Sequence, residues 1–230
     1  MQVIDNKALL FNTRKSSQIT SIIPKSKVLE SNGDVDQVLV NWGFDEVQLL
    51  RNLGIREVPS PILGRYKWPG MFTPFDHQRT TAEFLTLHPR CFVFNEAGTG
   101  KTSAAIWAAD YLMNKGIIRR VLVICPLSIM FSAWQADLFK TAMHRTCGVA
   151  HGSASRRKKV IEGGYDFVVI NYDGVGVVQK EISEGNFDLI IIDESEQVLS
   201  HFMSETLKSR EYIFKRLERL LHNSHTIICL

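Results

Sequence analysis

The sequence contains only four cysteines in 230 residues, and no two of them form a C-x-x-C pair. Each lies in or beside an apolar, strand-like run, which favours buried, reduced thiols over metal ligands or disulfide bonds. Long apolar runs are also missing, because the longest, VLVICPLSIMF, contains Pro126 and is shorter than the ~20 residues that span a bilayer. The N-terminus has no signal-peptide stretch. We therefore expect an intracellular, cytoplasmic protein with no membrane-embedded part.

A strong charge of either sign is absent as well. The 27 basic and 24 acidic residues leave a net charge of +3, which neither requires nor excludes a polyanionic partner. The one dense charge cluster is the run RRKK at residues 156–159. Its simplest interpretation is a solvated helix face, and a nucleic-acid contact is the alternative. Charge therefore leaves the class of partner open.

From Cys91 onward, short apolar runs alternate with helical patterns. The runs are continuous and do not alternate with polar residues, which is typical of strands covered on both faces in a parallel sheet. Strands are expected at residues 91–94, 121–125, 147–152, 167–170, 189–193 and 226–230. Helices are expected at residues 102–113, 128–139, 153–161 and 205–221. This part of the chain is therefore predicted to be an α/β domain with a mostly parallel sheet.

The beginning of the chain has a different pattern. Candidate strands lie at residues 8–12, 18–23 and 37–42, followed by a helix from Asp45 to about Leu53. A connector rich in proline and glycine comes next. We predict a small α+β accessory domain at residues 1–58, a connector at 59–74 and the larger α/β domain at 75–230. The accessory domain could bind a partner or only cap the larger domain, and the sequence fits both roles.

The stretch FNEAGTGKT joins an expected strand to an expected helix, which is the context that a phosphate-binding loop requires. Gly98 and Gly100 allow the backbone to turn its N–H groups toward phosphate oxygens, and Lys101 supplies a positive charge. The Thr102 hydroxyl can ligate Mg²⁺ at the helix N-terminus. Asn95 stands where the strict G-x-x-x-x-G-K-[ST] pattern has glycine, but this change removes neither the charge nor the metal ligand. The stretch therefore predicts a nucleotide site that uses Mg²⁺.

Two adjacent carboxylates, Asp193 and Glu194, follow the apolar run LIII. Acidic residues at the carboxyl end of a buried parallel strand lie at the sheet edge where ligands bind in open α/β folds. There Asp193 can hold Mg²⁺ through water, and Glu194 can orient or deprotonate an attacking water. The alternative is that both carboxylates only cap a following helix. Together with the phosphate-binding loop, the pair predicts an NTPase.

These motifs resemble those of the first motor domain in superfamily 2 helicases, particularly the Swi/Snf-type DNA translocases and their phage-encoded relatives. The resemblance covers roughly residues 70–230, and the position of Asn95 is commonly Asp or Ala in that family. It implies a RecA-like P-loop NTPase domain that binds ATP and Mg²⁺ within an ATP-dependent DNA helicase or translocase of a bacterial cell or phage-infected host. The catalytic residues that it implies are Lys101, Asp193 and Glu194.

Upstream of the loop, the segment FDHQ resembles the family's adenine-reading motif. Gln78 would bond the adenine edge, because an amide offers a donor and an acceptor together, and Phe75 would pack on the base. The other cofactor-binding residues that the resemblance implies are Gly98, Thr99, Gly100, Lys101 and Thr102. Thr102 and Asp193 would be the metal ligands.

Two further segments resemble the family's strand-contacting motifs. In CPLS, Pro126 and Ser128 would grip phosphates of one DNA strand, and in NYD the same role would fall to Asn171 and Tyr172. Such contacts position the protein without reading the base sequence, which is what a translocating motor needs. Trp134, which follows CPLS, is expected to be a packing residue. The resemblance therefore implies DNA, bound without sequence preference, as the partner.

The last residues, TIICL, resemble the strand that leads into the family's next motif. A second motor domain with its arginine fingers is not present in this sequence, and we therefore expect the chain to bind ATP but to hydrolyse it slowly or not at all. Two other hypotheses are a kinase or other phosphate-loop transferase acting on a small molecule, and a recruitment module in which the nucleotide fold is only a scaffold. The sequence does not separate unwinding from translocation, or DNA from RNA.

Overall fold

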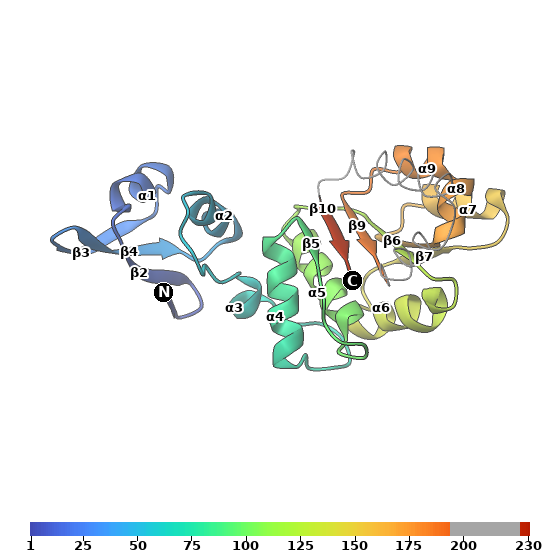
Figure 1. The fold of residues 1–230 in the computed structure, drawn as a ribbon, viewed down its shortest axis with the longest axis horizontal. Coiled ribbons are helices and arrows are strands. Elements are labelled where there is room, and N and C mark those ends of the chain that lie inside the picture. The colour runs from blue at the N-terminus through green and yellow to red at the C-terminus, as the bar shows by residue number, and fades with distance from the viewer. Residues whose placement is uncertain (194–225) are drawn as a thin grey trace. The chain divides into compact units, whose positions relative to one another are not determined.

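The computed structural model describes residues 1–193 and 226–230, and the helix expected at residues 205–221 lies outside them. The chain divides into two compact units, Met1–Lys67 and Trp68–Leu230 (Figure 1). The division falls inside the segment 59–74, which the sequence suggested as a connector. Each unit has its own sheet and its own buried core.

The first unit is built on an antiparallel sheet with the strand order β1-β2-β4-β3. Its strands are β1 (Gln2–Ile4), β2 (Ala8–Thr13), β3 (Lys27–Asn32) and β4 (Val35–Asn41). Its helices are α1 (Ser16–Ile22), α2 (Phe44–Asn52) and α3 (Ile62–Arg65). Leu9, Val38 and Val40 are fully buried, because alternate residues of β2 and β4 face the helices. The unit is therefore a small α+β fold, as predicted.

The prediction of a strand at residues 18–23 is wrong, because this stretch forms most of helix α1. Ile19 and Ile23 are both buried, whereas Ile22 is 45% exposed. Apolar residues spaced by four lie on one face of a helix, and the Ile23 N–H donates to the Ile19 carbonyl at 2.8 Å. The β-branched content of QITSII favoured a strand, but burial followed the helical spacing. Strand β3 was missed because all six of its residues are exposed and show no apolar alternation.

The described part of the second unit contains a parallel sheet with the strand order β5-β10-β9-β6-β8-β7. The strands are β5 (Arg90–Phe92), β6 (Val121–Cys125), β7 (Cys147–Ala150), β8 (Phe167–Asn171), β9 (Leu189–Ile192) and β10 (Thr226–Cys229). The helices are α4 (Asp76–Leu87), α5 (Lys101–Asn114), the π-helix η1 (Met130–Gln135), α6 (Ala136–Thr141), α7 (Ala154–Glu162), α8 (Tyr172–Val177) and α9 (Gln179–Glu184). The predicted α/β class with a mostly parallel sheet is confirmed.

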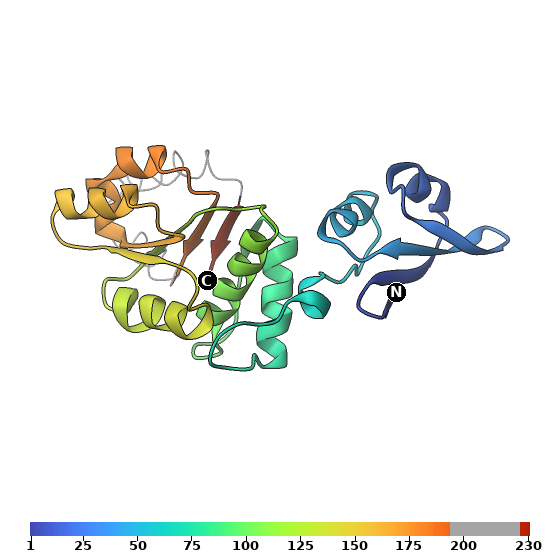
Figure 2. The same ribbon diagram turned by 180° about the vertical axis from the view of Figure 1, so that it is seen from behind.

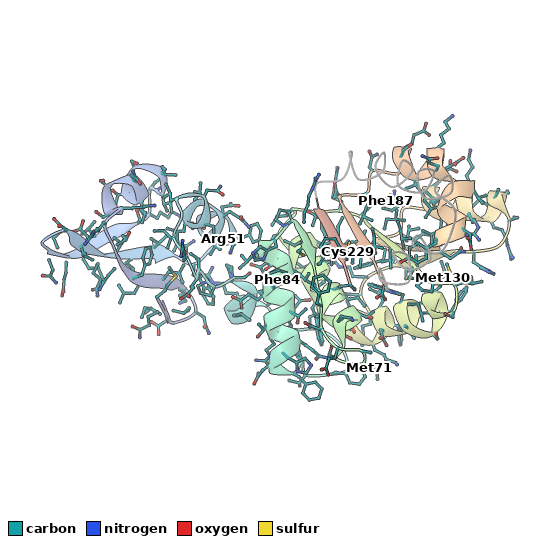
Figure 3. The ribbon with its side chains drawn as sticks, viewed as in Figure 1. Arg51, Met71, Phe84, Met130, Phe187 and Cys229 are labelled. Atoms are coloured by element: carbon teal, nitrogen blue, oxygen red, sulfur yellow. The ribbon has the colours of Figure 1, made fainter. Side chains whose placement is uncertain are left out.

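Helices cover both faces of this sheet. Figures 1 and 2 show α7, α8 and α9 together on one side and α4, α5 and α6 together on the other. On the first side, Ile161, Val175 and Ile182 pack against alternate residues of the central strands. Phe187 also belongs to this core, and the partly buried Cys229 packs against it; both are labelled in Figure 3. Burial on both faces explains why the central strands β6, β8 and β9 are continuous apolar runs.

The cysteines lie in or next to these strands. Burial raises the pKa of Cys147 to about 11, and burial followed by the neighbouring Cys229 raises the pKa of Cys91 to about 11. Both thiols therefore stay protonated at neutral pH and are poor nucleophiles. Among the described residues, no helix is long and apolar enough to cross a membrane.

A polar network joins the C-terminal half of α5 to the turn after α6. The Asp110 side chain is fully buried and accepts hydrogen bonds from Arg145 Nε at 2.6 Å and from Asn114 Nδ2 at 3.1 Å. His144 Nε2 lies 2.8 Å from the same carboxylate. The Arg145 side chain is only 16% exposed. The network therefore fixes two neighbouring helices through a buried charge.

Candidate functional site

The carboxyl ends of the parallel strands form one row across the second unit. Phe92, Cys229, Ile192, Ile124 and Ile170 pair with one another in this order from β5 to β8. The segments that follow these residues are the ones that the sequence singled out as motifs. Because all the strands are parallel, these segments leave the sheet at a single edge, which is where ligands bind in open α/β folds.

The loop between β5 and α5 has the backbone shape that its glycines permit. Gly98 has φ 77° and Gly100 has φ 78°, which is the left-handed region that other residues rarely adopt. A Cβ on Gly98 would meet no atom within 4 Å, whereas a Cβ on Gly100 would collide with the Gln78 amide. Thr99 closes the turn by donating from its hydroxyl to the Glu96 carbonyl at 2.8 Å. The loop therefore forms a cradle of main-chain groups.

Helix α5 begins at Lys101, directly after this cradle. The Lys101 ammonium donates to the Asn95 carbonyl at 2.9 Å and so lies against the loop. Thr102 is in the first turn of the helix, where main-chain N–H groups point outward and the helix dipole favours negative charge. Charge, dipole and hydroxyl thus meet at one helix end, and their role toward a nucleotide stays a prediction.

Asn95 connects the loop to helix α4. Its Nδ2 donates to Thr81 Oγ1 at 2.9 Å, and the Thr81 hydroxyl in turn donates to the His77 carbonyl at 2.8 Å. Glycine at position 95 could not make this connection. The departure from the strict pattern therefore has a structural role in this chain.

Asn95→Gly, which restores the strict pattern, is expected to lower the free energy of unfolding by about 1–2 kcal/mol. The change removes one hydrogen bond, worth ~1 kcal/mol, and adds the backbone freedom of glycine, which costs about 0.5–1 kcal/mol. Urea denaturation followed by circular dichroism would measure it. Asn95→Ala is the matched control, since it loses only the hydrogen bond and should lose about half as much. Wild-type stability in both variants would contradict the role of this contact.

Phe75 and Gln78 lie at the N-terminus of α4, next to the loop. Gln78 accepts from the Phe75 N–H at 3.0 Å and donates to the Thr99 carbonyl at 3.3 Å. His77 Nε2 is also 3.0 Å from that carbonyl. Phe75 is 68% exposed, and its ring stacks on His77 with 5.6 Å between centroids. The structure places Gln78 against the loop and Phe75 beside Gln78. The role of both residues toward a base stays a prediction.

Asp193 lies directly after β9 and is 7% exposed. Its Oδ2 accepts a hydrogen bond from the Trp134 indole N–H at 2.7 Å, and its carbonyl accepts from the Tyr172 hydroxyl at 2.5 Å. Its N–H donates to the Ile124 carbonyl at 2.9 Å. The predicted catalytic residue Glu194 lies outside the described residues. Trp134 was expected only to pack, and its contact with Asp193 was missed.

The predicted strand-contacting residues follow β6 or lie at the end of β8. Ser128 is exposed and Pro126 is half-buried. Asn171 is 5% exposed, and its Oδ1 accepts from Arg157 Nη1 at 2.8 Å. Tyr172 is half-buried and contacts Asp193 as described above. All four therefore lie at the same sheet edge, and their contact with nucleic acid stays a prediction.

The interpretation of the run RRKK as a solvated helix face is wrong for one of its four residues. Arg157 is 9% exposed and also donates to the carbonyls of Ala150 at 2.8 Å and Gly152 at 3.0 Å. The other three residues of the run are exposed. The signal in the sequence was the spacing to Ile161, because residues four apart lie on the same helix face and Ile161 is buried. Arg157 thus holds the end of β8 in place.

The residues at this edge fit a magnesium nucleotide. Among residues 1–193 and 226–230, no three His, Cys, Asp or Glu side chains gather to hold a metal ion by themselves. Mg²⁺ is commonly bound by one or two protein oxygens together with phosphate oxygens, and Thr102 and Asp193 offer such oxygens. The loop is open at Gly98, where a Cβ would meet no atom within 4 Å. Thr102 and Asp193 therefore offer the kind of oxygen donors that Mg²⁺ takes in proteins.

We compared the chain with known protein families and solved structures. The sequence model of the family described as "Type III restriction enzyme, res subunit" matches residues 73–219. No curated protein matches the sequence. The SWI2/SNF2 ATPase core of Sulfolobus solfataricus in complex with dsDNA is 24% identical, with a TM-score of 0.58, over 71% of this chain and 32% of that one.

The SWI2/SNF2 ATPase core domain of the same organism is 22% identical. Its TM-score is 0.54, over 70% of this chain and 31% of that chain. These likenesses confirm the predicted RecA-like fold of the larger unit. The chain spans about a third of the length of the solved structures that it matches.

Proposed function

This chain belongs to the family of the type III restriction enzyme, res subunit, and we propose that its larger unit is the ATP-binding motor domain of a DNA helicase or translocase. The observation that carries the proposal is the row of strand ends, which places the glycine cradle, Lys101 and Asp193 at one sheet edge. In a complete motor, cycles of ATP hydrolysis would drive movement on DNA. A small-molecule transferase has no comparable support, because neither the family nor the fold points to one.

The roles of the residues follow from their chemistry. The N–H groups of Gly98, Thr99 and Gly100 would surround phosphate oxygens, and Lys101 would neutralise charge on the β and γ phosphates. Thr102 and Asp193 would hold Mg²⁺, whose charge stabilises the phosphate that is transferred. These are the roles for which main-chain donors, a fixed cation and oxygen ligands are suited.

The remaining roles concern the attacking water and the adenine of ATP. Glu194 would orient or deprotonate the water that attacks the γ phosphate. Gln78 and Phe75 would hold the adenine next to the cradle, which their position at the start of α4 supports. Lys101, Asp193 and Glu194 are thus the residues that we propose to be catalytic.

The proposed nucleic-acid contacts lie at the same edge. Pro126 and Ser128 after β6, with Asn171 and Tyr172 at the end of β8, would hold one strand through its phosphates. One of the similar SWI2/SNF2 cores was solved in complex with dsDNA, and the shared fold supports a similar partner for this chain. Such binding would weaken steeply with salt, because it releases counterions from the phosphates.

A calorimetric titration with ATP and Mg²⁺ tests the proposal. We expect one nucleotide to bind per chain, more tightly with Mg²⁺ than without it. ATP turnover should be slow and independent of small phosphoryl acceptors, and fluorescence anisotropy should show salt-dependent binding of duplexes of unrelated sequence. A chain that binds no nucleotide in the presence of Mg²⁺, or that consumes ATP only with a small acceptor, would contradict the proposal.

A further inference from the structure

Trp134 differs from two other buried tryptophans in the partner that its indole N–H finds. Trp42 donates to the Pro59 carbonyl at 2.8 Å, and Trp107 donates to the Pro69 carbonyl at 2.9 Å. Trp134, which is 1% exposed, donates to the carboxylate of Asp193 at 2.7 Å, across 59 positions of sequence. A buried indole N–H needs a partner, but a main-chain carbonyl would satisfy it. The hydrogen bond to Asp193 is therefore not needed to satisfy the indole, and its effect is to hold the carboxylate.

The π-helix η1 places Trp134 for this contact. Met130, labelled in Figure 3, and Trp134 are four positions apart and both buried, whereas Phe131 is 49% exposed. The π-helix is rare in proteins, and its single turns are frequent at functional sites. The π-helix is separated by one residue from the segment CPLS, which starts at the end of β6. Trp134 thus belongs to the same segment as the proposed contact residue Ser128.

Tyr172 holds the same residue from another side. It begins helix α8 after β8, and its hydroxyl donates to the Asp193 main-chain carbonyl at 2.5 Å. Asp193 is therefore fixed at its carboxylate by the segment after β6 and at its carbonyl by the segment after β8. Its N–H is fixed by Ile124 in the neighbouring strand. Hydrogen bonds of this kind orient carboxylates that bind metal ions.

We propose that Trp134 and Tyr172 are positioning residues, which hold Asp193 in the orientation that binds the magnesium ion of the nucleotide. This inference rests on the proposed function, since it assigns the two side chains to that same site. Both come from the segments in which Ser128 and Asn171 are proposed to contact nucleic acid. A shift of either segment would therefore change the hold on Asp193 and, through it, the affinity for Mg²⁺.

Trp134→Phe tests the inference, because it removes the indole N–H and keeps an aromatic side chain. Binding of a fluorescent ATP analogue to the 230-residue chain is followed as the Mg²⁺ concentration is raised. The midpoint in Mg²⁺ should rise about 10-fold, the lower end of what losing an outer-shell partner of a metal ligand costs. Binding without Mg²⁺ should equal that of the wild-type chain, since the loop and Lys101 are unchanged.

Trp107→Phe is the matched control. It removes another buried indole N–H from the same unit and should leave the Mg²⁺ midpoint unchanged. Tyr172→Phe removes only a hydroxyl and should raise the midpoint about 3-fold, because it loosens the main chain and not the carboxylate. This variant also serves if Trp134→Phe does not fold, as judged by circular dichroism.

Three outcomes would overturn the inference. A wild-type midpoint in every folded variant of Trp134 and Tyr172 shows that they do not position Asp193. An equal rise of the Mg²⁺ midpoint in Trp107→Phe shows that losing any buried indole raises the midpoint. A wild-type chain that binds no analogue with Mg²⁺ defeats the proposed function and this inference together, and that result is seen before any substitution is made.

Discussion

Lys101→Ala is expected to lower the affinity of the chain for ATP with Mg²⁺ about 100-fold. The ammonium lies against the phosphate cradle, where it donates to the Asn95 carbonyl, and it starts the helix whose N-terminus faces the cradle. Losing a hydrogen bond to a charged group costs up to ~3 kcal/mol, which corresponds to roughly two powers of ten in the dissociation constant. Isothermal titration calorimetry would measure the change.

Lys115→Ala is the control for this substitution. Lys115 lies at the other end of the same helix, is exposed, and has its ammonium 5.5 Å from the centre of the Tyr111 ring. Its removal changes the net charge by the same amount and should leave nucleotide affinity as in the wild-type chain. Thermal unfolding should show that both variants are folded. A folded Lys101→Ala chain with wild-type affinity would refute the assignment of the phosphate-binding loop.

Asp110→Asn is expected to lower the free energy of unfolding of the larger unit by about 3–5 kcal/mol. The substitution keeps the shape of the side chain but leaves Arg145, which is largely buried, without its ionic partner. Breaking a buried pair in this way costs several kcal/mol, because the remaining charge is uncompensated. The loss is large against the ~5–15 kcal/mol that stabilises a typical domain. Urea denaturation monitored by circular dichroism would measure it.

Asp137→Asn removes the same kind of charge at the surface. Asp137 pairs with Lys140 at 3.7 Å, and the two side chains are 34% and 45% exposed. Exposed pairs of this kind contribute about 0–1 kcal/mol, so this variant should be almost as stable as the wild-type chain. If both substitutions cost the same, the buried network does not hold α5 to the turn after α6.

The phosphate-binding loop could be predicted in detail because its physics is local. Two glycines, a lysine and a threonine lie within the five consecutive positions 98–102. The observed φ values of Gly98 and Gly100 are those that only glycine adopts easily. The strands of the larger unit could be predicted for a similar reason. The central strands β6, β8 and β9 are continuous apolar runs and are buried along their whole length. The edge strand β5 is the exception, because Arg90 and Phe92 are exposed.

Side-chain partners could not be predicted in the same way. Nothing in the sequence relates Trp134 to Asp193, or Arg157 to Asn171, because these pairs are 59 and 14 positions apart. Their contacts depend on the order of strands in the sheet. The error at residues 18–23 has a different cause, since two buried isoleucines spaced by four outweighed a β-branched composition.

The sequence by itself determined the family resemblance, the α/β class and the chemical groups of the nucleotide site. These follow from residue types at fixed local spacings, where the chain's own geometry sets the structure. Only the tertiary structure decided that β10 lies between β5 and β9, and that the segments after β6 and β8 both reach Asp193. Strand order is set by packing over the whole sheet, and no local pattern records it.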